Sequence, residues 1–299
     1  MVTTFGNSII TAFTNGIPVN EIYTYGKLVW PDPYYIKWNP SSAGGQFNID
    51  GTTHDLSTFG GRYYWSTGII NANAFNNNRS ITSIETNATS IGSSAFYSCS
   101  NLMSAILPEC QIVEDYAFGG TVGLFLDTVE LPKCEYIGYG AFSHQTQIHY
   151  HSEILNLPKC SYIGSYAFYN CYALPGVSLP NCEYIGSSAF YGDDELKSLD
   201  LPKCSYIGSC AFLGALELTK VKLSVCSYVG DSAFYLCPSL TEMYLYYSSV
   251  CVLFSSGVLS QTPFSRGSGS IYVPSSLVSA YKTADNWSYY SSQIRSIPQ

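Results

Sequence analysis

The sequence predicts a β-rich repeat solenoid with a small β section at its N-terminal end and a strand-plus-helix cap at its C-terminal end. An Ala-Phe pair recurs, and the intervals between its phenylalanines are 21, 22, 24, 26, 22, 22 and 22 residues. Such a period is typical of arrays in which each repeat buries its apolar face against its neighbours. We therefore expect about eight coils of roughly 22 residues. The recurring residues are Phe75, Phe96, Phe118, Phe142, Phe168, Phe190, Phe212 and Phe234.

One repeat unit reads Leu-Pro-x-Cys-x-Tyr-Ile-Gly, then two residues, then Ala-Phe. Leu199–Pro202 fits a short strand that ends at its proline, and the next strand holds Cys204 and Ile207. The segment Ser209–Gly214 is predicted to form one helical or 3-10 turn that drives its phenylalanine inward. Glu114 replaces the glycine of one unit, so the glycine slot does not require a positive φ.

The length of the unit varies at a single point. From the Leu of Leu-Pro to the following Phe the count is 11 residues, as between Leu107 and Phe118. The additions fall in residues 119–128 and 143–154 of neighbouring coils. Insertions on one face often mark a binding face, although tolerated loop drift explains them equally well. The candidate binding residues there are Phe125, Asp127, His144, His149, His151 and Glu153.

Most of the eleven cysteines follow the repeat. Six share one slot and three share a second slot, and equivalent residues of stacked coils lie about 4.8 Å apart with parallel Cβ directions. That geometry disfavours disulfides, so we expect two ladders of buried thiols, with cross-links or a metal site as weaker alternatives. The ladder cysteines are Cys110, Cys134, Cys160, Cys182, Cys204 and Cys226 in the first slot, and Cys99, Cys171 and Cys237 in the second.

A tyrosine recurs two residues after the first cysteine slot and just before an inward Ile or Val. Neighbours in a strand point to opposite faces, so these rings are expected to line the outward face. They either stack on one another or bind a sugar or a protein. The row is Tyr136, Tyr162, Tyr184, Tyr206 and Tyr228.

The N-terminal flank is predicted to form two small β sections. Ile17–Trp30 alternate apolar and polar residues on both sides of Tyr25–Lys27, which indicates a hairpin, and residues 1–31 are expected to serve as a docking segment. Residues 32–68 contain Asp50-Gly51 between two short alternating runs, a type I′ hairpin signal, and are expected to cap the first coil.

The solenoid is placed at residues 69–250 and the C-terminal cap at residues 251–299. In the cap, Ser275 or Ser276 is expected to begin a helix. Its apolar residues would close the last coil, and they are Leu277, Val278, Tyr281 and Trp287.

Composition narrows the possible partners. Charged residues are 11% of the chain and the net charge is −8, so phosphate neutralisation and nucleic-acid binding are disfavoured. No apolar run is long enough for membrane insertion, and residues 1–16 lack the pattern of a secretory leader. A neutral surface rich in hydroxyls and 27 tyrosines suits proteins or glycans as partners.

Catalytic motifs are absent from the sequence: it has no GxSxG, HExxH, P-loop or dinucleotide-binding glycine pattern. The histidines near Glu153 and the acidic run Asp193–Glu195 are weak candidates for Zn²⁺ and Ca²⁺. We expect no catalytic residue, metal or cofactor.

Ile91–Leu102 fits the pattern I-G-x-x-A-F-x-x-C-x-x-L throughout. In this respect the chain resembles the BspA-type leucine-rich repeat of bacterial surface proteins. The resemblance implies a leucine-rich repeat fold without catalytic motif residues. It also implies functions such as adhesion and host-matrix binding.

Tyr23–Pro31 resembles the start of repeat proteins encoded by gut bacteriophages and prophages. That likeness implies a virion protein that docks on other virion proteins through residues 1–31 and presents the solenoid to the host surface. The alternative is a bacterial cell-surface or extracellular adhesin that binds a host protein or glycan. Either protein could be an oligomer.

Overall fold

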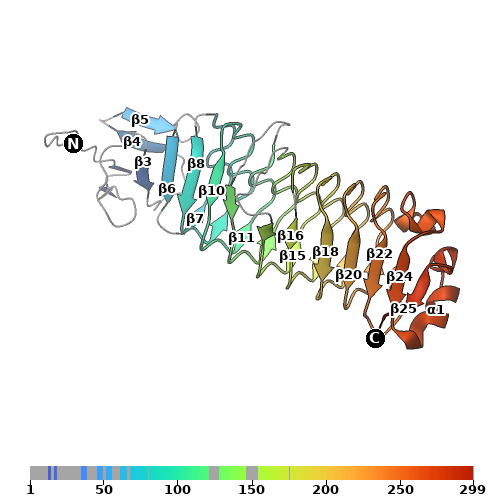
Figure 1. Ribbon diagram of the computed structural model, residues 1–299. Coiled ribbons are helices and arrows are strands. Elements are labelled where there is room, and N and C mark those ends of the chain that lie inside the picture. Colours follow the sequence, from blue (N-terminus) through green and yellow to red (C-terminus); the bar gives the residue numbers. More distant parts are fainter. Residues whose placement is uncertain are drawn as a thin grey trace.

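A computed structural model of the chain describes residues 13–14, 17–18, 35–38, 46–49, 52–55, 61–65, 68–79, 81–120, 128–145, 154–174 and 176–298. They form an elongated parallel β-solenoid that ends in a small helical cap (Figure 1). The predicted repeat solenoid is confirmed. None of the helices in these ranges is long and apolar enough to cross a membrane.

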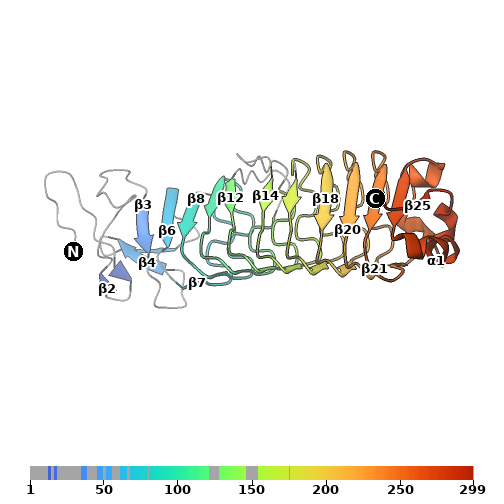
Figure 2. The same cartoon turned by 60° about the horizontal axis from the view of Figure 1, so that its bottom comes forward.

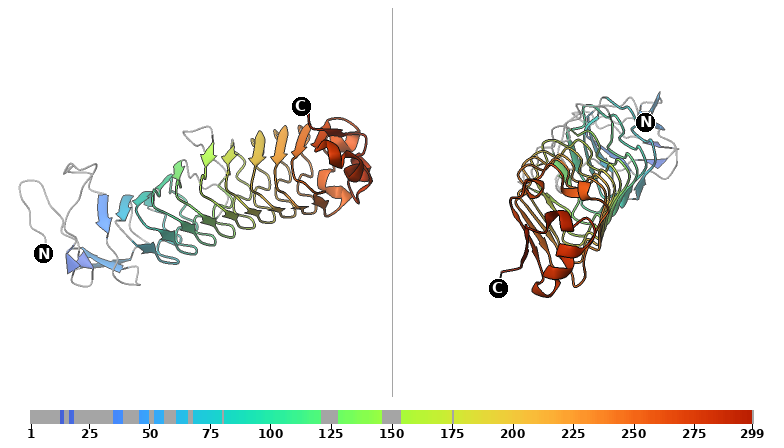
Figure 3. Two further views of the ribbon diagram at one scale, coloured as in Figure 1. Left: turned by 90° about the horizontal axis from the view of Figure 1, so that it is seen from below. Right: turned by 90° about the vertical axis from the view of Figure 1, so that its right-hand side faces the viewer.

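One side of the solenoid is a nine-stranded parallel sheet of two-residue strands, one from each coil (Figure 3). Each strand pairs in register with its equivalent, so Tyr184 lies beside Tyr206 and Ile185 beside Ile207. The strands are β7 (Ile69–Ile70), β9 (Ser90–Ile91), β11 (Ile112–Val113), β13 (Tyr136–Ile137), β15 (Tyr162–Ile163), β17 (Tyr184–Ile185), β19 (Tyr206–Ile207), β21 (Tyr228–Val229) and β23 (Val252–Leu253).

A second side carries strands of two to six residues in three consecutive ladders (Figure 2). The first contains β3 (Tyr35–Trp38), β6 (Gly61–Trp65), β8 (Ile81–Thr86), β10 (Ser104–Ile106) and β12 (Thr128–Glu130). The second contains β14 (Leu155–Asn156) and β16 (Val177–Ser178). The third contains β18 (Ser198–Leu201), β20 (Lys220–Leu223), β22 (Glu242–Leu245), β24 (Ser270–Val273) and β25 (Ile294–Ser296).

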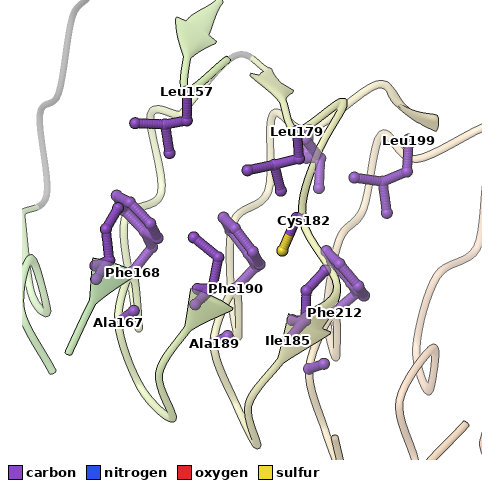
Figure 4. Packing of buried hydrophobic residues seen from close by; sticks show 14 of the residues in the cluster. Leu157, Ala167, Phe168, Leu179, Cys182, Ile185, Ala189, Phe190, Leu199 and Phe212 are labelled. Atoms are coloured by element: carbon purple, nitrogen blue, oxygen red, sulfur yellow. The ribbon is translucent and has the colours of Figure 1, made fainter. Parts of the chain in front are cut away.

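The repeat phenylalanines form one continuous stack inside the solenoid, and Figure 4 shows three of them. Phe190 lies between Phe168 and Phe212, with 5.2 and 5.3 Å between ring centroids and interplanar angles of 8° and 3°. Burial of each such side chain is worth about 1.5–3 kcal/mol before conformational entropy is counted. Each coil is thus held chiefly by its two neighbours.

The Ala-Phe segment consists of tight turns, and the predicted helical or 3-10 turn is wrong. Cys210 and Gly214 take left-handed φ values of +56° and +81°. The backbone N–H groups of Cys210, Phe212 and Gly214 donate to carbonyls of the following coil at 2.8–3.0 Å. A helix would direct these bonds along its own axis, whereas the solenoid uses every second N–H to join two coils.

The glycine slot of the repeat is a place of close backbone approach. A Cβ atom at Gly208 would lie 2.5 Å from the backbone nitrogen of Ser187, and its φ is not positive. Close contact between coils explains why the interval from the Leu of Leu-Pro to the repeat Phe is constant at 11 residues. From Leu to Phe each residue is in register with the neighbouring coil, so an added residue would break the pairing.

All eleven cysteines carry free thiols. The first predicted ladder is confirmed, whereas the second slot holds buried thiols in coils that are not adjacent. In the first slot each Sγ donates to a backbone carbonyl two residues later, as Cys182 does to Tyr184 at 3.3 Å. Burial raises the pKa of the Cys182 thiol to about 12. These cysteines therefore act as small buried hydrophobic residues with a weak hydrogen bond.

The N-terminal section also contains a separate four-stranded sheet, with the strand order β2-β1-β4-β5. β4 (Gln46–Ile49) and β5 (Thr52–Asp55) pair antiparallel across the predicted Asp50-Gly51 hairpin. β1 (Phe13–Thr14) and β2 (Ile17–Pro18) also pair antiparallel. The hairpin predicted around Tyr25–Lys27 lies outside the described residues.

The C-terminal cap satisfies the backbone of the last coil with side chains. Trp287 Nε1 donates to the Cys251 carbonyl at 2.6 Å, and Asn286 Nδ2 donates to the Leu253 carbonyl at 2.9 Å. In earlier coils the equivalent carbonyls accept backbone N–H groups from the next coil. The cap therefore replaces a further coil, and it buries Tyr281 as predicted.

The cap contains one α-helix, α1 (Val278–Thr283), and four 3-10 helices. No side chain caps the start of α1 or of the preceding 3-10 helix, so the predicted N-cap at Ser275 or Ser276 is wrong. The geometry explains this, because the chain enters the turn directly from Pro274, which supplies a fixed φ but no side-chain acceptor. The 3-10 helices are η2 (Ser256–Leu259), η3 (Phe264–Arg266), η4 (Ser275–Leu277) and η5 (Ser288–Tyr290).

Candidate recognition surface

The predicted tyrosine row lies on the outward face of the nine-stranded sheet and forms a regular stack. Its ring centroids are 4.8–5.0 Å apart and its interplanar angles are 2–7°. Each inner ring therefore has both faces against neighbouring rings. We call this row the tyrosine ladder, and it offers edges and hydroxyl groups to solvent but few open ring faces.

A second group of tyrosines lies on the turns that follow the glycine slot. We call it the tyrosine cluster. Its rings approach within 4.8–6.1 Å, but most are strongly inclined to one another, by 88° for Tyr97–Tyr116, 61° for Tyr116–Tyr139 and 42° for Tyr139–Tyr166. Its members are Tyr97, Tyr116, Tyr139, Tyr166, Tyr169 and Tyr191.

Both groups contain exposed and partly buried tyrosines, so ring orientation separates them better than exposure does. Tyr116 and Tyr139 are each 39% exposed and Tyr166 is 37% exposed, about the same as Tyr136 at the end of the ladder. Inclined rings cannot cover one another completely, so each leaves part of a face open together with its hydroxyl group. Such a ring can stack on a ligand and hydrogen-bond to it at once.

Two glycines hold the Tyr116 ring in place. A Cβ atom at Gly140 would lie 2.7 Å from Cε1 and 2.8 Å from Cδ1 of that ring. A Cβ atom at Gly119 would lie 3.4 Å from its Cδ1. The φ of Gly140 is +58°, which a residue with a side chain adopts only at a cost. The ring of Tyr116 is therefore fixed by backbone and not by a flexible loop.

The acidic groups beside the cluster are bonded to backbone. Asp115 Oδ1 accepts from the Tyr139 N–H at 2.7 Å, and Glu114 Oε2 accepts from the N–H and hydroxyl of Ser93 at 2.9 Å each. Partial burial, followed by the hydrogen bond with Tyr139 and nearby charges, raises the pKa of Tyr116. The phenol therefore stays protonated and neutral at pH 7.

His144 is the one predicted site residue among those described. Its ring lies 5.4 Å from Tyr169 at 75°, its φ is +64°, and its Nδ1 atom is buried without a hydrogen-bond partner in the described part of the chain. Burial lowers the pKa of His144, which favours the neutral imidazole. It therefore borders the cluster as a neutral polar group.

The other predicted site residues lie outside the described residues: Phe125, Asp127, His149, His151 and Glu153. Their proposed role stays a prediction. The two insertions nevertheless begin at this surface, because residues 121–127 follow Gly119 and Gly120 directly and residues 146–153 follow His144 and Gln145.

The predicted Zn²⁺ and Ca²⁺ sites are not supported by a group of ligands in the described residues. Within the residues that the structure describes, no three His, Cys, Asp or Glu side chains come together as a metal site. Asp193 is fully buried, whereas Glu195 two residues later is exposed, so the acidic run does not face one ion.

The family of the chain follows from its repeat sequence. The model of the BspA type leucine-rich repeat region matches residues 68–157 and 161–284 in six copies. The chain belongs to the BspA-type leucine-rich repeat family. No curated protein matches the chain.

Three solved structures match the chain at low similarity. A leucine-rich cell surface protein from Faecalibacterium prausnitzii A2-165 is 18% identical, with 100% of this chain and 95% of that chain covered and a TM-score of 0.36. A leucine-rich repeat protein from Bacteroides ovatus is 16% identical, with 94% and 99% covered and a TM-score of 0.36. The pneumococcal vaccine antigen PcpA is 13% identical, with 91% and 92% covered and a TM-score of 0.39. These values are too low to transfer a function.

The BspA-type motif explains why sequence reasoning missed the tyrosine cluster. The motif residues, such as Ala167, Phe168 and Cys171, are all buried. The cluster occupies the variable positions between them: Tyr139 follows a glycine slot, Tyr166 precedes an alanine and Tyr169 follows a phenylalanine. Its members come from three different slots, and none of these slots holds tyrosine in every coil. The available signals were a local excess of tyrosine between residues 97 and 191 and the recurrence of tyrosine directly after some repeat phenylalanines.

Proposed function

We propose that this BspA-type protein is a non-enzymatic recognition protein that binds a protein or glycan on a cell surface through the tyrosine cluster. One observation carries the proposal. Tyr116, Tyr139 and Tyr166 present inclined, partly open ring faces from three successive coils, next to two insertions.

The cluster combines open apolar rings with rigid placement. Tyrosine supplies a large contact area and a hydroxyl group, and it loses little conformational entropy on binding. The turns beneath are held by backbone bonds between coils, such as Tyr116 N to Tyr139 O at 2.7 Å and Tyr166 N to Ser187 O at 2.9 Å. A ligand therefore meets a surface that is already ordered.

The chemistry of the cysteines favours binding over catalysis. A catalytic thiol is partly exposed and has a lowered pKa. Burial instead raises the pKa of Cys99 and Cys110 to about 12, and both donate to backbone carbonyls. Function as an adhesin, as in other members of this family, needs no such group.

The binding test uses a triple variant with Tyr116, Tyr139 and Tyr166 replaced by Ala, and a matched triple variant with the ladder residues Tyr162, Tyr184 and Tyr206 replaced by Ala. The three proteins are applied to intact gut bacteria, to host-matrix proteins and to neutral polysaccharides. We expect capture by wild-type and ladder variant and at least tenfold weaker capture by the cluster variant. Equal capture by both variants would refute the role of the cluster.

The finer proposal is that the protein is a phage virion component, attached to other virion proteins through residues 1–31. Its support is the likeness of Tyr23–Pro31 to the starts of phage-encoded repeat proteins. A bacterial cell-surface adhesin is the second candidate, and it is favoured by the functions of the repeat family.

Location separates these two candidates. Mass spectrometry of purified phage particles should detect the protein together with the capsid if it is a virion component. Labelling of intact bacteria should tag it if it is an adhesin. Its absence from particles together with surface labelling of uninfected cells would refute the virion proposal.

A further inference from the structure

The slot three residues after each repeat phenylalanine makes the same bond in several coils. Its side chain donates a hydrogen bond to the carbonyl of the phenylalanine of the preceding coil. Three thiols do so at 3.0–3.3 Å, and an amide does so in a fourth coil. The pairs are Cys99 to Phe75, Gln145 to Phe118, Cys171 to Phe142 and Cys237 to Phe212.

Asp193 occupies this slot in the coil of Phe190 and is completely buried. Its Oδ1 atom accepts from the Cys171 N–H at 3.1 Å, and the same N–H lies 3.2 Å from the Phe168 carbonyl oxygen. The carboxyl group and that carbonyl thus share one donor. The Oδ2 atom is buried and has no hydrogen-bond partner within the described residues.

A carboxylate at this position would compete with the Phe168 carbonyl for one N–H group and would leave its Oδ2 acceptor buried without a partner. A buried acceptor without a partner is costly, and a buried charge is more so. We propose that Asp193 is a neutral carboxylic acid in the folded protein, with the proton on Oδ2 donated to the Phe168 carbonyl. It then makes the same bond as the cysteines and the glutamine of this slot.

The groups around Asp193 oppose its ionisation. Burial raises the pKa of Asp193 well above its ordinary value, the Cys171 N–H lowers it in part, and the neighbouring Asp194 raises it further. The preceding coil faces it with the Cys171 thiol, whose pKa burial also raises. The following coil has the uncharged Ala215 in the same slot.

The position connects this acid to the tyrosine cluster. Tyr191 lies two residues before Asp193, and its ring is 4.8 Å from that of Tyr169. The intervening Gly192 has a left-handed φ of +74°. Loss of the proton would loosen the turn that carries Tyr191. This coupling rests on the proposed function, whereas the protonation of Asp193 does not.

The test compares unfolding by urea of wild-type and Asp193→Asn between pH 4.5 and pH 8.5. Asn keeps the acceptor for Cys171 and a donor for Phe168 but cannot ionise. Above the ordinary pKa of 3.8 the unfolded wild-type chain releases a proton that the folded chain keeps. The wild-type folding equilibrium constant should therefore fall relative to the variant by up to tenfold per pH unit, until the folded acid ionises.

Asp194→Asn is the matched control, because that half-buried neighbour is not in the slot. It should leave most of the wild-type pH dependence in place. Parallel curves for wild-type and Asp193→Asn would overturn the proposal, as would an Asp193→Asn variant less stable than wild-type at pH 8.5. Because the readout is unfolding, either result leaves the binding proposal untouched.

Discussion

The ring of Tyr139 lies 5.2 Å from that of Tyr116 and is inclined to it by 61°. The two residues come from adjacent coils but from different slots of the repeat, so they cannot stack in register. By contrast, Tyr184 and Tyr206 share a slot and are parallel to within 3°. One repeat thus produces two tyrosine surfaces, and only the one with inclined rings keeps ring faces open to a ligand.

Gly140→Ala should displace the Tyr116 ring. The added Cβ would clash with it, and the left-handed φ of +58° should cost about 1–2 kcal/mol of unfolding free energy. Gly214→Ala is the control, since its φ is +81° but its Cβ would meet nothing closer than 3.8 Å. Urea unfolding should show a loss of stability in both variants, and the loss should be larger in Gly140→Ala because of the added clash. Ligand capture should fall in Gly140→Ala alone. Equal capture by the two variants would contradict the role of Gly140 in positioning the Tyr116 ring.

Phe190→Ala should destabilise the solenoid by about 3–5 kcal/mol. The substitution removes one ring from a continuous stack and leaves a cavity between Phe168 and Phe212. Phe254→Ala, at a residue that is 60% exposed, should change the free energy of unfolding by less than about 0.5 kcal/mol. Comparable losses in the two variants would mean that the stack is not the source of cohesion between coils.

Much of this fold was predictable, because a repeat makes the same contact in every coil. The slots of Phe190, Cys182 and Tyr184 could be assigned as inward or outward from their period alone. Backbone conformation could not, since the position of Cys210 also holds tyrosine, serine and glycine and gives no composition signal for a left-handed φ.

For the candidate site, the sequence predicted the approximate location but not the residues. The changes in repeat length pointed to residues 119–128 and 143–154, which begin beside the tyrosine cluster. The cluster itself arises where rings from several slots meet in space, as those of Tyr116 and Tyr139 do. No count along the chain reveals such a meeting.

Trp287→Phe should weaken the cap by about 1–3 kcal/mol, because it leaves the carbonyl of buried Cys251 without its indole donor. The ring of Phe still fills most of the site. Hydrogen exchange should show faster opening of the last coils and little change near Phe96. Tyr289→Phe, at a residue 73% exposed, serves as the control. Uniform exchange along the solenoid would argue against a local role for the cap.

Alkaline pH should destabilise the protein from about pH 9 upward. Burial raises the thiol pKa of Cys182 and Cys237 from 9.0 to about 12. The folded chain therefore keeps protons that the unfolded chain releases, so stability is present below pH 9 and is lost as pH rises toward 12. Cys182→Ala should reduce the slope of this loss in urea unfolding between pH 8 and pH 11. An unchanged slope would contradict the assignment of Cys182 as a buried neutral thiol.

The most direct test of recognition through the tyrosine cluster is the dissociation constant of a captured ligand for two single variants, Tyr139→Ala and Tyr184→Ala. Both remove one tyrosine, but the first opens a gap in the cluster and the second a gap in the ladder. We predict at least a tenfold higher dissociation constant for Tyr139→Ala, and a value within twofold of wild-type for Tyr184→Ala. A loss confined to Tyr184→Ala, or equal values for the two variants, would contradict the account.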